Sequence, residues 1–240
     1  MLHKTRGIVL KTTNYSETSV VVQVFTERFG LQSYLVNGAR KPKAKIGTTL
    51  LQPLHLLDMV VYQRANASLQ RISEARQKPP FQTIPYDVAK RAVALFLNEV
   101  LYKCLRQQSA DEPLFNYVFN AVSWLDSTDR MSPNFHLLFL LKLSRYLGFH
   151  PASPKPGQRF FDLKDGVFCG QLPAHPLVLS GPHTTQFANL LTVSFDQLDT
   201  LRLPLADRRF LLGRILAFYQ FHVDHLGEIK SHEVLEAVLD

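Results

Sequence analysis

Cysteine is scarce in this sequence, since Cys104 and Cys169 are the only two among 240 residues. Two cysteines cannot build the disulfide framework of a small secreted domain. No apolar run reaches the roughly 18 residues of a membrane span, and the longest candidate lies around residues 137–143. The first residues also lack the apolar segment of a signal peptide. These absences predict a cytoplasmic protein without membrane association.

Catalytic signatures are also missing. The chain has no Gly-x-Gly-x-x-Gly, no Gly-Lys-Ser/Thr phosphate loop and no Gly-x-Ser-x-Gly elbow. We therefore expect a protein that is not an enzyme and needs no cofactor. With 46% hydrophobic and 20% charged residues, the composition still favours a folded chain with a real core over a disordered one.

One histidine cluster leaves a metal-dependent hydrolase open as a weaker alternative. His222 and His225 lie three residues apart on a predicted helix, so both side chains are able to face one metal ion. Asp224, Glu228 and His232 follow nearby. Histidines near the C-terminal end of a helix also complement its dipole and bind its free carbonyls. We favour this second interpretation and expect no metal site.

The basic charge is concentrated in the first third of the chain. Residues 1–80 hold 12 Lys and Arg against 4 Asp and Glu, whereas residues 81–240 hold 15 against 16. Such a distribution is typical of a small module that binds a polyanion, fused to a nearly neutral body. A generic basic surface is the simpler alternative.

The same first third has the hydrophobic pattern of strands. Val20, Val22 and Val24 alternate with other residues and so share one face. Five short antiparallel strands in about 75 residues suit a small barrel such as the OB-fold. The predicted strands begin at Ile8–Leu10 and continue with Thr18–Thr26, Leu31–Val36, Leu50–Tyr62 and Ser68–Arg76. We predict an OB-fold nucleic-acid-binding domain over residues 1–80.

A proline-rich hinge at Lys78–Pro85 separates this part from a mainly helical domain at 81–240. The fold class is therefore α+β. Ser132 and Ser231 are predicted helix N-caps, with Pro133 at a first helical position. A small hairpin insertion is expected near residues 151–183, from Arg159–Leu163 and Gly166–Gly170. The predicted helices are Asp87–Gln107, Pro113–Leu125, Asn134–Leu147, Leu205–Leu226 and Ser231–Leu239.

A basic loop is the best functional signal. Gly38 and Pro42 shape a turn that carries four cations within six positions. Cations in a mobile loop can follow a phosphate backbone without reading bases, and a tyrosine in an OB-fold can stack on one. The candidate DNA-binding residues are Lys4, Arg6, Lys11, Arg28, Tyr34, Arg40, Lys41, Lys43 and Lys45. Each alone also fits a solvated surface charge, and Tyr34 equally fits a core residue.

Several segments in order resemble the RecO family of bacterial DNA-repair proteins. They include Thr5–Lys11, Tyr15–Ser19, Phe25–Gly30, Asn37–Pro42, Leu51–Leu54, Tyr146–Phe149 and Ser231–Leu235. The resemblance implies an N-terminal OB domain, a helical C-terminal domain and a role as recombination mediator. Such proteins bind single- and double-stranded DNA, anneal complementary strands, and with RecR help to load RecA onto strands coated by single-strand-binding protein. A nucleoid-associated location follows from the same resemblance.

The chain departs from many members of that family in one respect. Those members carry a four-cysteine zinc site after a Leu-Gly-Tyr/Phe segment. Here Leu147-Gly148-Phe149 is followed only by Cys169, without any Cys-x-x-Cys. His150, His175 and His183 are the other ligand types in this region, and their spacing is irregular. We expect the hairpin and its prolines to hold the region without zinc.

The resemblance also implies that the acidic C-terminal tail of single-strand-binding protein docks on the helical domain. Such a tail needs an apolar pocket and a nearby cation. The candidate residues are Leu138, Leu141, Lys142, Arg145, Arg208, Arg209, Leu212 and Arg214. Arg145 is the first choice because it lies in the last turn of its predicted helix beside apolar neighbours. An RNA-binding or ribosome-associated OB-fold adaptor is the main alternative function.

Overall fold

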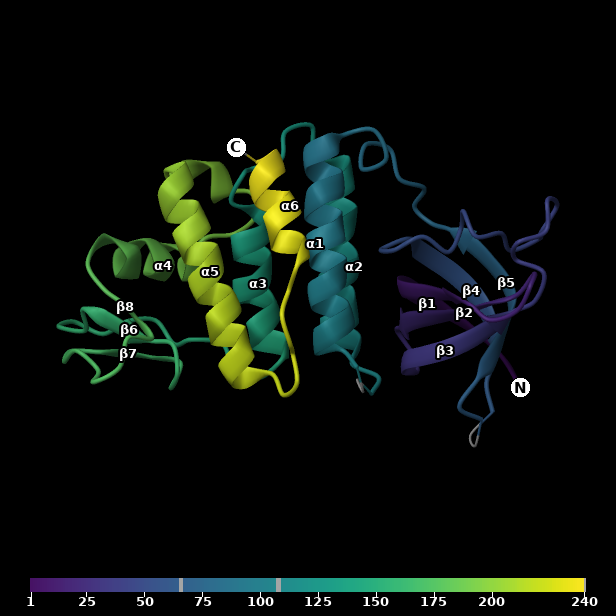
Figure 1. The fold of residues 1–240 in the computed structure, drawn as a ribbon, viewed down its shortest axis with the longest axis horizontal. Coiled ribbons are helices and arrows are strands. Elements are labelled where there is room, and N and C mark those ends of the chain that lie inside the picture. Colours follow the sequence, from purple (N-terminus) through teal and green to yellow (C-terminus); the bar gives the residue numbers. More distant parts are fainter. Residues whose placement is uncertain (65–66, 107–108, 240) are drawn as a thin grey trace. The chain divides into compact units, whose positions relative to one another are not determined.

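Five strands close into a barrel at the N-terminal end of the chain (Figure 1). The computed structural model describes residues 1–64, 67–106 and 109–239. The strands are β1 (Leu2–Asn14), β2 (Val20–Thr26), β3 (Gly30–Val36), β4 (Leu56–Tyr62) and β5 (Gln70–Gln77). Their order around the barrel is β1-β2-β3-β5-β4, with β3 and β5 parallel and the other pairs antiparallel. This confirms the predicted five-stranded, OB-like barrel.

The barrel interior is formed by the alternating apolar residues of the strands. Val20, Val22 and Val24 are fully buried there, as their spacing predicts. Gly7 faces the same interior, where a Cβ atom would lie 2.5 Å from Met59 Cε and 2.6 Å from Val24 Cγ1. The close approach of β1 to these side chains therefore requires glycine at this position.

Two strands differ in extent from their prediction. β1 runs from Leu2 to Asn14 because its first half pairs with β4 and its second half with β2. The predicted strand at 50–62 begins only at Leu56. Residues before it form turns, where Leu54 adopts a φ of 61° and its amide donates to Val9 O at 2.7 Å.

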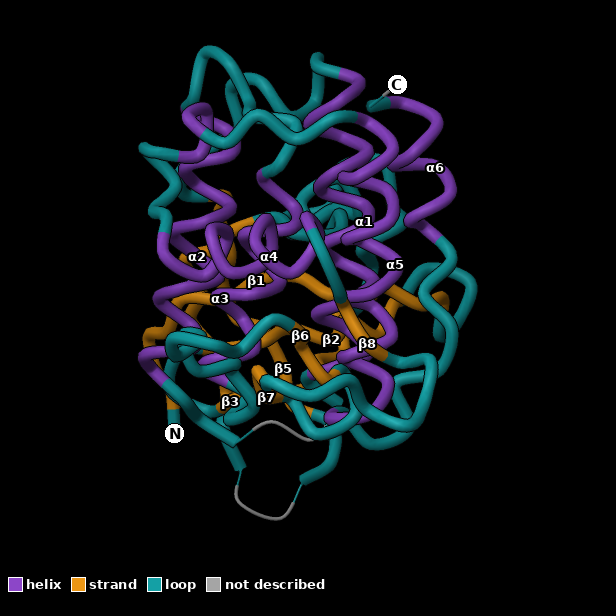
Figure 2. Tube along the Cα trace, turned by 90° about the vertical axis from the view of Figure 1, so that its left-hand side faces the viewer, coloured by secondary structure: helices purple, strands orange, loops and turns teal. Residues whose placement is uncertain are grey.

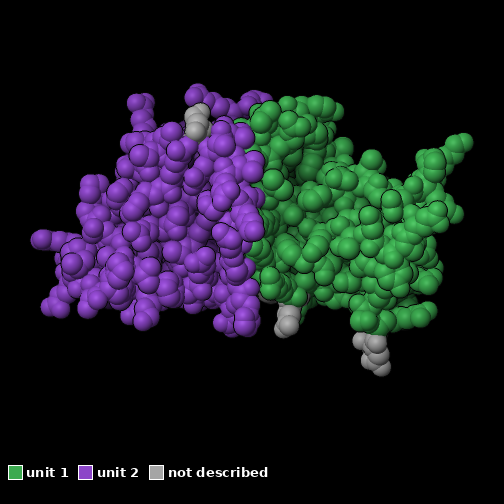
Figure 3. Space-filling view, viewed as in Figure 1, with its two compact units in different colours: residues 1–128 green, residues 129–240 purple. Residues whose placement is uncertain are grey.

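The helices α1 (Val88–Cys104) and α2 (Glu112–Ser127) belong to the same compact unit as the barrel. This unit comprises residues 1–128, and residues 129–240 form the second (Figure 3). Phe25 of β2 lies 5.7 Å from Phe115 of α2, between ring centroids. Asn98 Nδ2 of α1 donates to Leu10 O at 3.1 Å. The compact units thus divide after two helices, not at the change from strands to helices near residue 80.

The segment predicted as a hinge is tied to the end of α2. The buried Asp126 carboxylate accepts hydrogen bonds from the amides of Gln82, Thr83 and Ile84, at 2.7, 2.9 and 2.9 Å. The buried Lys90 ammonium donates to Thr83 Oγ1 at 2.7 Å and to two carbonyls at the end of α2. These bonds fix the link between barrel and helices within the first unit.

The second unit, as described over residues 129–239, contains four α-helices, a short 3₁₀ turn at Leu198–Thr200 and a small sheet. The helices are α3 (Phe135–Tyr146), α4 (Pro182–Thr192), α5 (Leu205–His222) and α6 (Ser231–Val238). The sheet contains β6 (Phe160–Asp162), β7 (Val167–Cys169) and β8 (Val178–Leu179), in the order β7-β6-β8. Figure 2 distinguishes these helices and strands along the Cα trace. The predicted hairpin is confirmed, whereas α4 and β8 were not predicted.

Several helix ends differ from their predicted positions. Neither α3 nor α6 has a serine N-cap, because Asn134 and Lys230 occupy those positions without side-chain capping bonds. α5 ends at His222, before the positive φ angles of His225 and Gly227. The predicted end of the first helix, Gln107, lies outside the described residues. Within the described ranges, none of the helices is long and apolar enough to cross a membrane.

Candidate nucleic-acid interface

The basic loop between β3 and β4 is anchored on the barrel. Ala39 and Ile46 are buried in the barrel core, together with Leu51 farther along the loop. The Arg40 amide donates to Thr18 O at 3.1 Å, and the Thr48 amide donates to Ala39 O at 3.2 Å. The mobile loop expected from the sequence is therefore a fixed platform.

Three cations project from this platform. The side chains of Arg40, Lys41 and Lys43 are exposed, and none of them forms an ion pair with any carboxylate in the described parts of the chain. Lys45 lies 3.8 Å from Glu74, and both side chains are mostly solvent-exposed. Such an exposed pair contributes little free energy. The loop thus presents positive charge that is available to an external anion.

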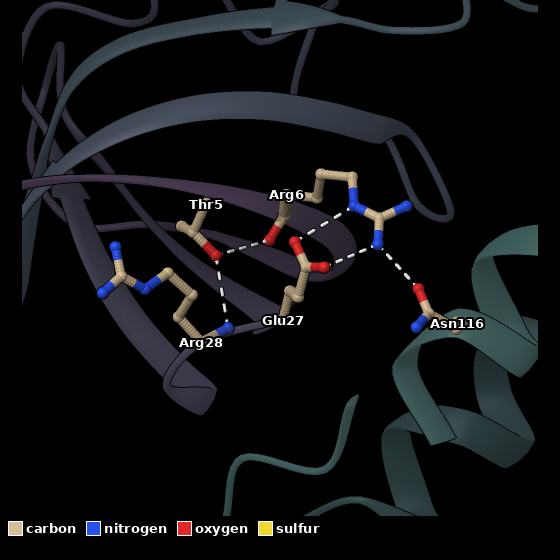
Figure 4. Close-up of polar contacts among 5 residues, drawn as sticks. All are labelled: Thr5, Arg6, Glu27, Arg28 and Asn116. Atoms are coloured by element: carbon tan, nitrogen blue, oxygen red, sulfur yellow. Dashed lines mark hydrogen bonds and ion pairs between the residues drawn. The ribbon is translucent and has the colours of Figure 1, made fainter. Parts of the chain in front are cut away.

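Arg6 has a different role from the one predicted. Its guanidinium donates to both carboxylate oxygens of Glu27, at 3.0 and 2.6 Å, and to Asn116 Oδ1 of α2 at 2.6 Å (Figure 4). It also lies over the rings of Phe115 and Phe119, 5.2 and 4.8 Å from their centroids.

Both partners of this ion pair are stabilised in their charged forms. The hydrogen bonds between them raise the pKa of Arg6 and lower the pKa of Glu27. Arg6 therefore fastens the barrel to α2, and its Nε and Nη2 groups are engaged by Glu27 and Asn116. The prediction that Arg6 contacts DNA is corrected on this ground.

The other predicted cations of the strands and turns are exposed. Lys11 Nζ donates to Tyr102 Oη at 3.1 Å and lies 4.8 Å from the centroid of that ring. Arg28, at the β2–β3 turn, lies over the Phe29 ring, 5.7 Å from its centroid, and an Nη1 donates to Lys4 O at 3.5 Å. These weak contacts orient the charged groups of Lys11 and Arg28, which remain at the surface.

Tyr34 is the second corrected residue. Its side chain is fully buried within the barrel, and burial raises the pKa of its hydroxyl. A base therefore cannot reach the ring. The sequence left a core role open for Tyr34, and this is the role that the structure gives it.

A surface cavity that the sequence did not indicate lies on the outer side of β1, β4 and β5. Its volume is about 680 Å³. Lys4 and Lys45 line it together with Arg76 of β5, while Glu27, Asp58 and Glu74 supply negative charges. Once the strand register is known, the alternation of polar and apolar residues in β4 and β5 indicates which of their side chains face outward.

The predicted partner-binding residues of α3 do not form a surface site. Leu138 and Leu141 of α3 are fully buried, so they are core residues and cannot line an open pocket. Lys142 is half-buried, and burial, with a smaller effect of the Arg145 charge, lowers its pKa. Arg145 is exposed in the last turn of the helix.

Three of the four predicted partner-binding residues of α5 lie together beside α6. Arg208, Arg209 and Leu212 line a cavity of about 10 Å³ with the end of α6. Arg208 donates to Leu239 O at 3.0 Å, and Arg209 lies 3.5 Å from Glu236 O. Arg214 instead lies over the ring of Phe210, 4.9 Å from its centroid. A cavity of this volume holds about one water molecule, so an apolar side chain would enter only if α6 moved.

The histidines weighed as metal ligands lie in separate environments. His222 stacks on Phe149 at a centroid distance of 5.4 Å, His175 lies 3.2 Å from Asp162, and His183 lies 3.3 Å from Asp207. Among the residues that the structure describes, no three His, Cys, Asp or Glu side chains are grouped so as to hold a metal ion.

Two family models together cover most of the chain, and the boundary between them falls between the barrel and the helices. A family model described as Recombination protein O N terminal matches residues 1–81, and one described as Recombination protein O C terminal matches residues 85–232. Proteins named DNA repair protein RecO from Phocaeicola vulgatus and Bacteroides fragilis are each 35% identical to this chain, over 98% and 100% of both sequences. The protein of that name from Flavobacterium psychrophilum is 34% identical over 98% of both. Since the matches span nearly the whole length, the chain belongs to the RecO family of DNA repair proteins.

Proposed function

We propose that this protein is a recombination mediator that binds single- and double-stranded DNA and anneals complementary strands. It helps to load RecA recombinase onto strands coated by single-strand-binding protein, and RecR is a partner in this step. The protein acts by binding and not by making or breaking bonds. The observation that carries the proposal is the anchored loop with three exposed, unpaired cations, Arg40, Lys41 and Lys43.

Charge neutralisation gives a physical route to annealing. Two DNA strands repel each other, and a cationic surface that screens both lowers the free energy of their encounter. Because this effect needs no base-specific contacts, a few lysines and arginines on a fixed platform suffice. The anchored loop also keeps the backbone of these residues in place, so that little backbone freedom is lost on binding.

Annealing of complementary oligonucleotides coated by single-strand-binding protein tests the proposal. The protein should accelerate annealing, and the Arg40→Ala/Lys41→Ala/Lys43→Ala variant should lose most of that acceleration. An RNA-binding adaptor predicts the opposite ranking, with tighter binding to structured RNA than to DNA and little acceleration. Equal annealing rates with and without the folded wild-type protein would refute the proposed activity.

The docking site for the acidic tail of single-strand-binding protein is proposed between α5 and α6. Arg209 is exposed there, and Leu205, Leu212 and Leu235 line the same small cavity. The tail carboxylates would pair with arginine while the last apolar side chain displaces the end of α6. Glu236 lies in the same lining and opposes an anionic tail, so replacing it with glutamine should tighten tail binding.

A further inference from the structure

The outer side of β1, β4 and β5 carries side chains that the basic loop does not explain. Strand register fixes which residues lie next to one another on it. Three rows cross the strands in the order β1, β4, β5: Leu2–Tyr62–Arg71, Lys4–Val60–Glu74 and Arg6–Asp58–Arg76. The intervening residues Met59 and Val61 point into the barrel core. We call this outer side, with the flanking Lys45 and Lys78, the outer strand face.

The outer strand face has a surplus of positive charge. It carries six cations, Lys4, Arg6, Lys45, Arg71, Arg76 and Lys78, against the three carboxylates Glu27, Asp58 and Glu74. Arg6 neutralises Glu27 at 2.6 Å, whereas Asp58 is shared between Arg76 at 3.2 Å and Lys78 at 3.4 Å. One carboxylate therefore faces two cations, and the cavity of about 680 Å³ lies over this part of the face.

Tyr62 is the exposed aromatic residue of this face. Its side chain is 45% exposed, next to the exposed Leu2 on one side and Arg71 on the other. Side chains directly opposite each other in neighbouring strands have Cβ atoms about 5 Å apart. A tyrosine ring beside an arginine and near a lysine offers both a stacking surface and phosphate contacts.

We propose that the outer strand face binds single-stranded DNA, with one base stacked on Tyr62 and phosphates contacted by Lys4, Arg71 and Arg76. The inference rests on the DNA binding proposed above and assigns it a second surface besides the basic loop. A base in a duplex is already stacked on both of its faces, so a protein ring on a strand selects unpaired bases. OB-folds bind oligonucleotides through the face of their second and third strands. Here that face carries no cation, because its outward residues are Val21, Gln23, Phe25, Leu31, Ser33 and Leu35.

The test compares Tyr62→Thr and Tyr62→Trp on an oligo(dT) strand and on an abasic strand of equal length. Loss of one base–aromatic stack costs roughly five- to 150-fold in Kd, so Tyr62→Thr should weaken oligo(dT) binding within that range. The abasic strand should be unaffected, because it has no base to stack. Tyr62→Trp should bind oligo(dT) at least as tightly as wild type and show fluorescence quenching beyond that of Trp124, the one native tryptophan.

The cations of the face need a different readout. Arg71→Ala/Arg76→Ala should weaken the binding of both oligonucleotides, oligo(dT) and abasic, and should reduce the slope of log K against log salt. Tyr62→Thr should leave that slope unchanged. Glu74→Gln should tighten the binding of both oligonucleotides, since it removes a carboxylate beside Lys45 that repels phosphate. Tyr15→Thr is the matched control, because Tyr15 is 63% exposed in the β1–β2 loop, outside this face.

The outcomes separate this inference from the proposed function. Salt-dependent oligo(dT) binding that is equal in wild type, Tyr62→Thr and Arg71→Ala/Arg76→Ala would overturn the outer strand face while leaving DNA binding intact. Absence of DNA binding by the wild-type protein would refute both. Tighter binding of oligo(U) than oligo(dT), with the same sensitivity to Tyr62→Thr, would overturn the assignment of DNA as the ligand. Melting curves by circular dichroism check that each variant is folded, and Tyr62→Trp keeps the test valid if Tyr62→Thr unfolds.

Discussion

Removal of the three loop cations should change how salt affects DNA binding. Each phosphate neutralised in a single strand contributes about −0.7 to the slope of log K against log salt, so about six contacts, three on the loop and three on the outer strand face, give a slope of about −4.2. Raising salt from about 50 to about 200 mM then weakens binding roughly 340-fold. Arg40→Ala/Lys41→Ala/Lys43→Ala should leave a slope of about −2.1, so that the same rise in salt weakens binding roughly 18-fold.

Fluorescence anisotropy of a labelled oligonucleotide at four or more salt concentrations measures these slopes. The matched control is Lys155→Ala/Arg159→Ala/Lys164→Ala, which removes the same net charge from exposed positions of the second unit. That control should keep the wild-type slope, because the basic surplus lies in residues 1–80. Mixed and homopolymeric strands should be affected alike, since phosphate contacts read no sequence. A wild-type slope in the folded loop variant would exclude the loop from the DNA site.

Three further predictions follow from the buried groups and the α5–α6 cavity. Asp126→Ala leaves three amides without their acceptor and should lower the free energy of unfolding by about 3 kcal/mol in urea, whereas the exposed Asp129→Ala should not change it. Burial and a nearby arginine lower the pKa of His136 to about 3, against about 6.5 unfolded. The unfolded chain therefore binds this proton first as the pH falls, and stability should fall by about 1.4 kcal/mol per pH unit between roughly pH 6 and 3; His136→Gln should flatten that decline. Arg209→Ala should weaken the binding of a labelled acidic tail peptide by about 1.5–3 kcal/mol. Weaker peptide binding by Arg145→Ala, with unchanged binding by Arg209→Ala, would contradict the α5–α6 site.

The barrel was predictable because its strands follow a two-residue period. Val20, Val22 and Val24 fall on one face by spacing alone, and all three lie in the core. Strand ends were less predictable, since they depend on which neighbour each segment meets. β1 continues to Asn14 only because β2 pairs with its second half, and residues 50–55 form turns although their composition is apolar.

The helical half shows where local rules fail. Serine is a favoured N-cap residue, yet α3 begins three residues after Ser132 and Ser231 is already the first residue of α6, and neither helix has a side-chain cap. Asp126 illustrates a longer-range effect, because a carboxylate 42 to 44 residues away in sequence holds the amides of residues 82–84. No local pattern indicates that pairing. The segment therefore had the composition of a hinge and the structure of a fixed connection.

The candidate site exposes the same limit for charges. Counting lysines and arginines identifies the module, because net charge is a property of composition, but it does not show which charges are available. Arg6 and Arg40 are equivalent in such a count. One is held by Glu27 and Asn116 between the barrel and α2, and the other is exposed on the loop. Availability is decided by the carboxylates that folding brings near each cation, and these come from distant segments.

The two tyrosines show why an exposed aromatic residue of a strand also escapes sequence analysis. Tyr34 and Tyr62 both lie within strands of the same barrel, and each has apolar and polar neighbours in sequence. Their faces follow from register: Tyr34 pairs with the core residue Val22, and Tyr62 pairs with the exposed Leu2 and Arg71. A shift of one residue exchanges the inner and outer faces of a strand. A base-stacking residue in a closed barrel can therefore be assigned only after the pairing of every strand is known, which is why the test of DNA stacking belongs at Tyr62.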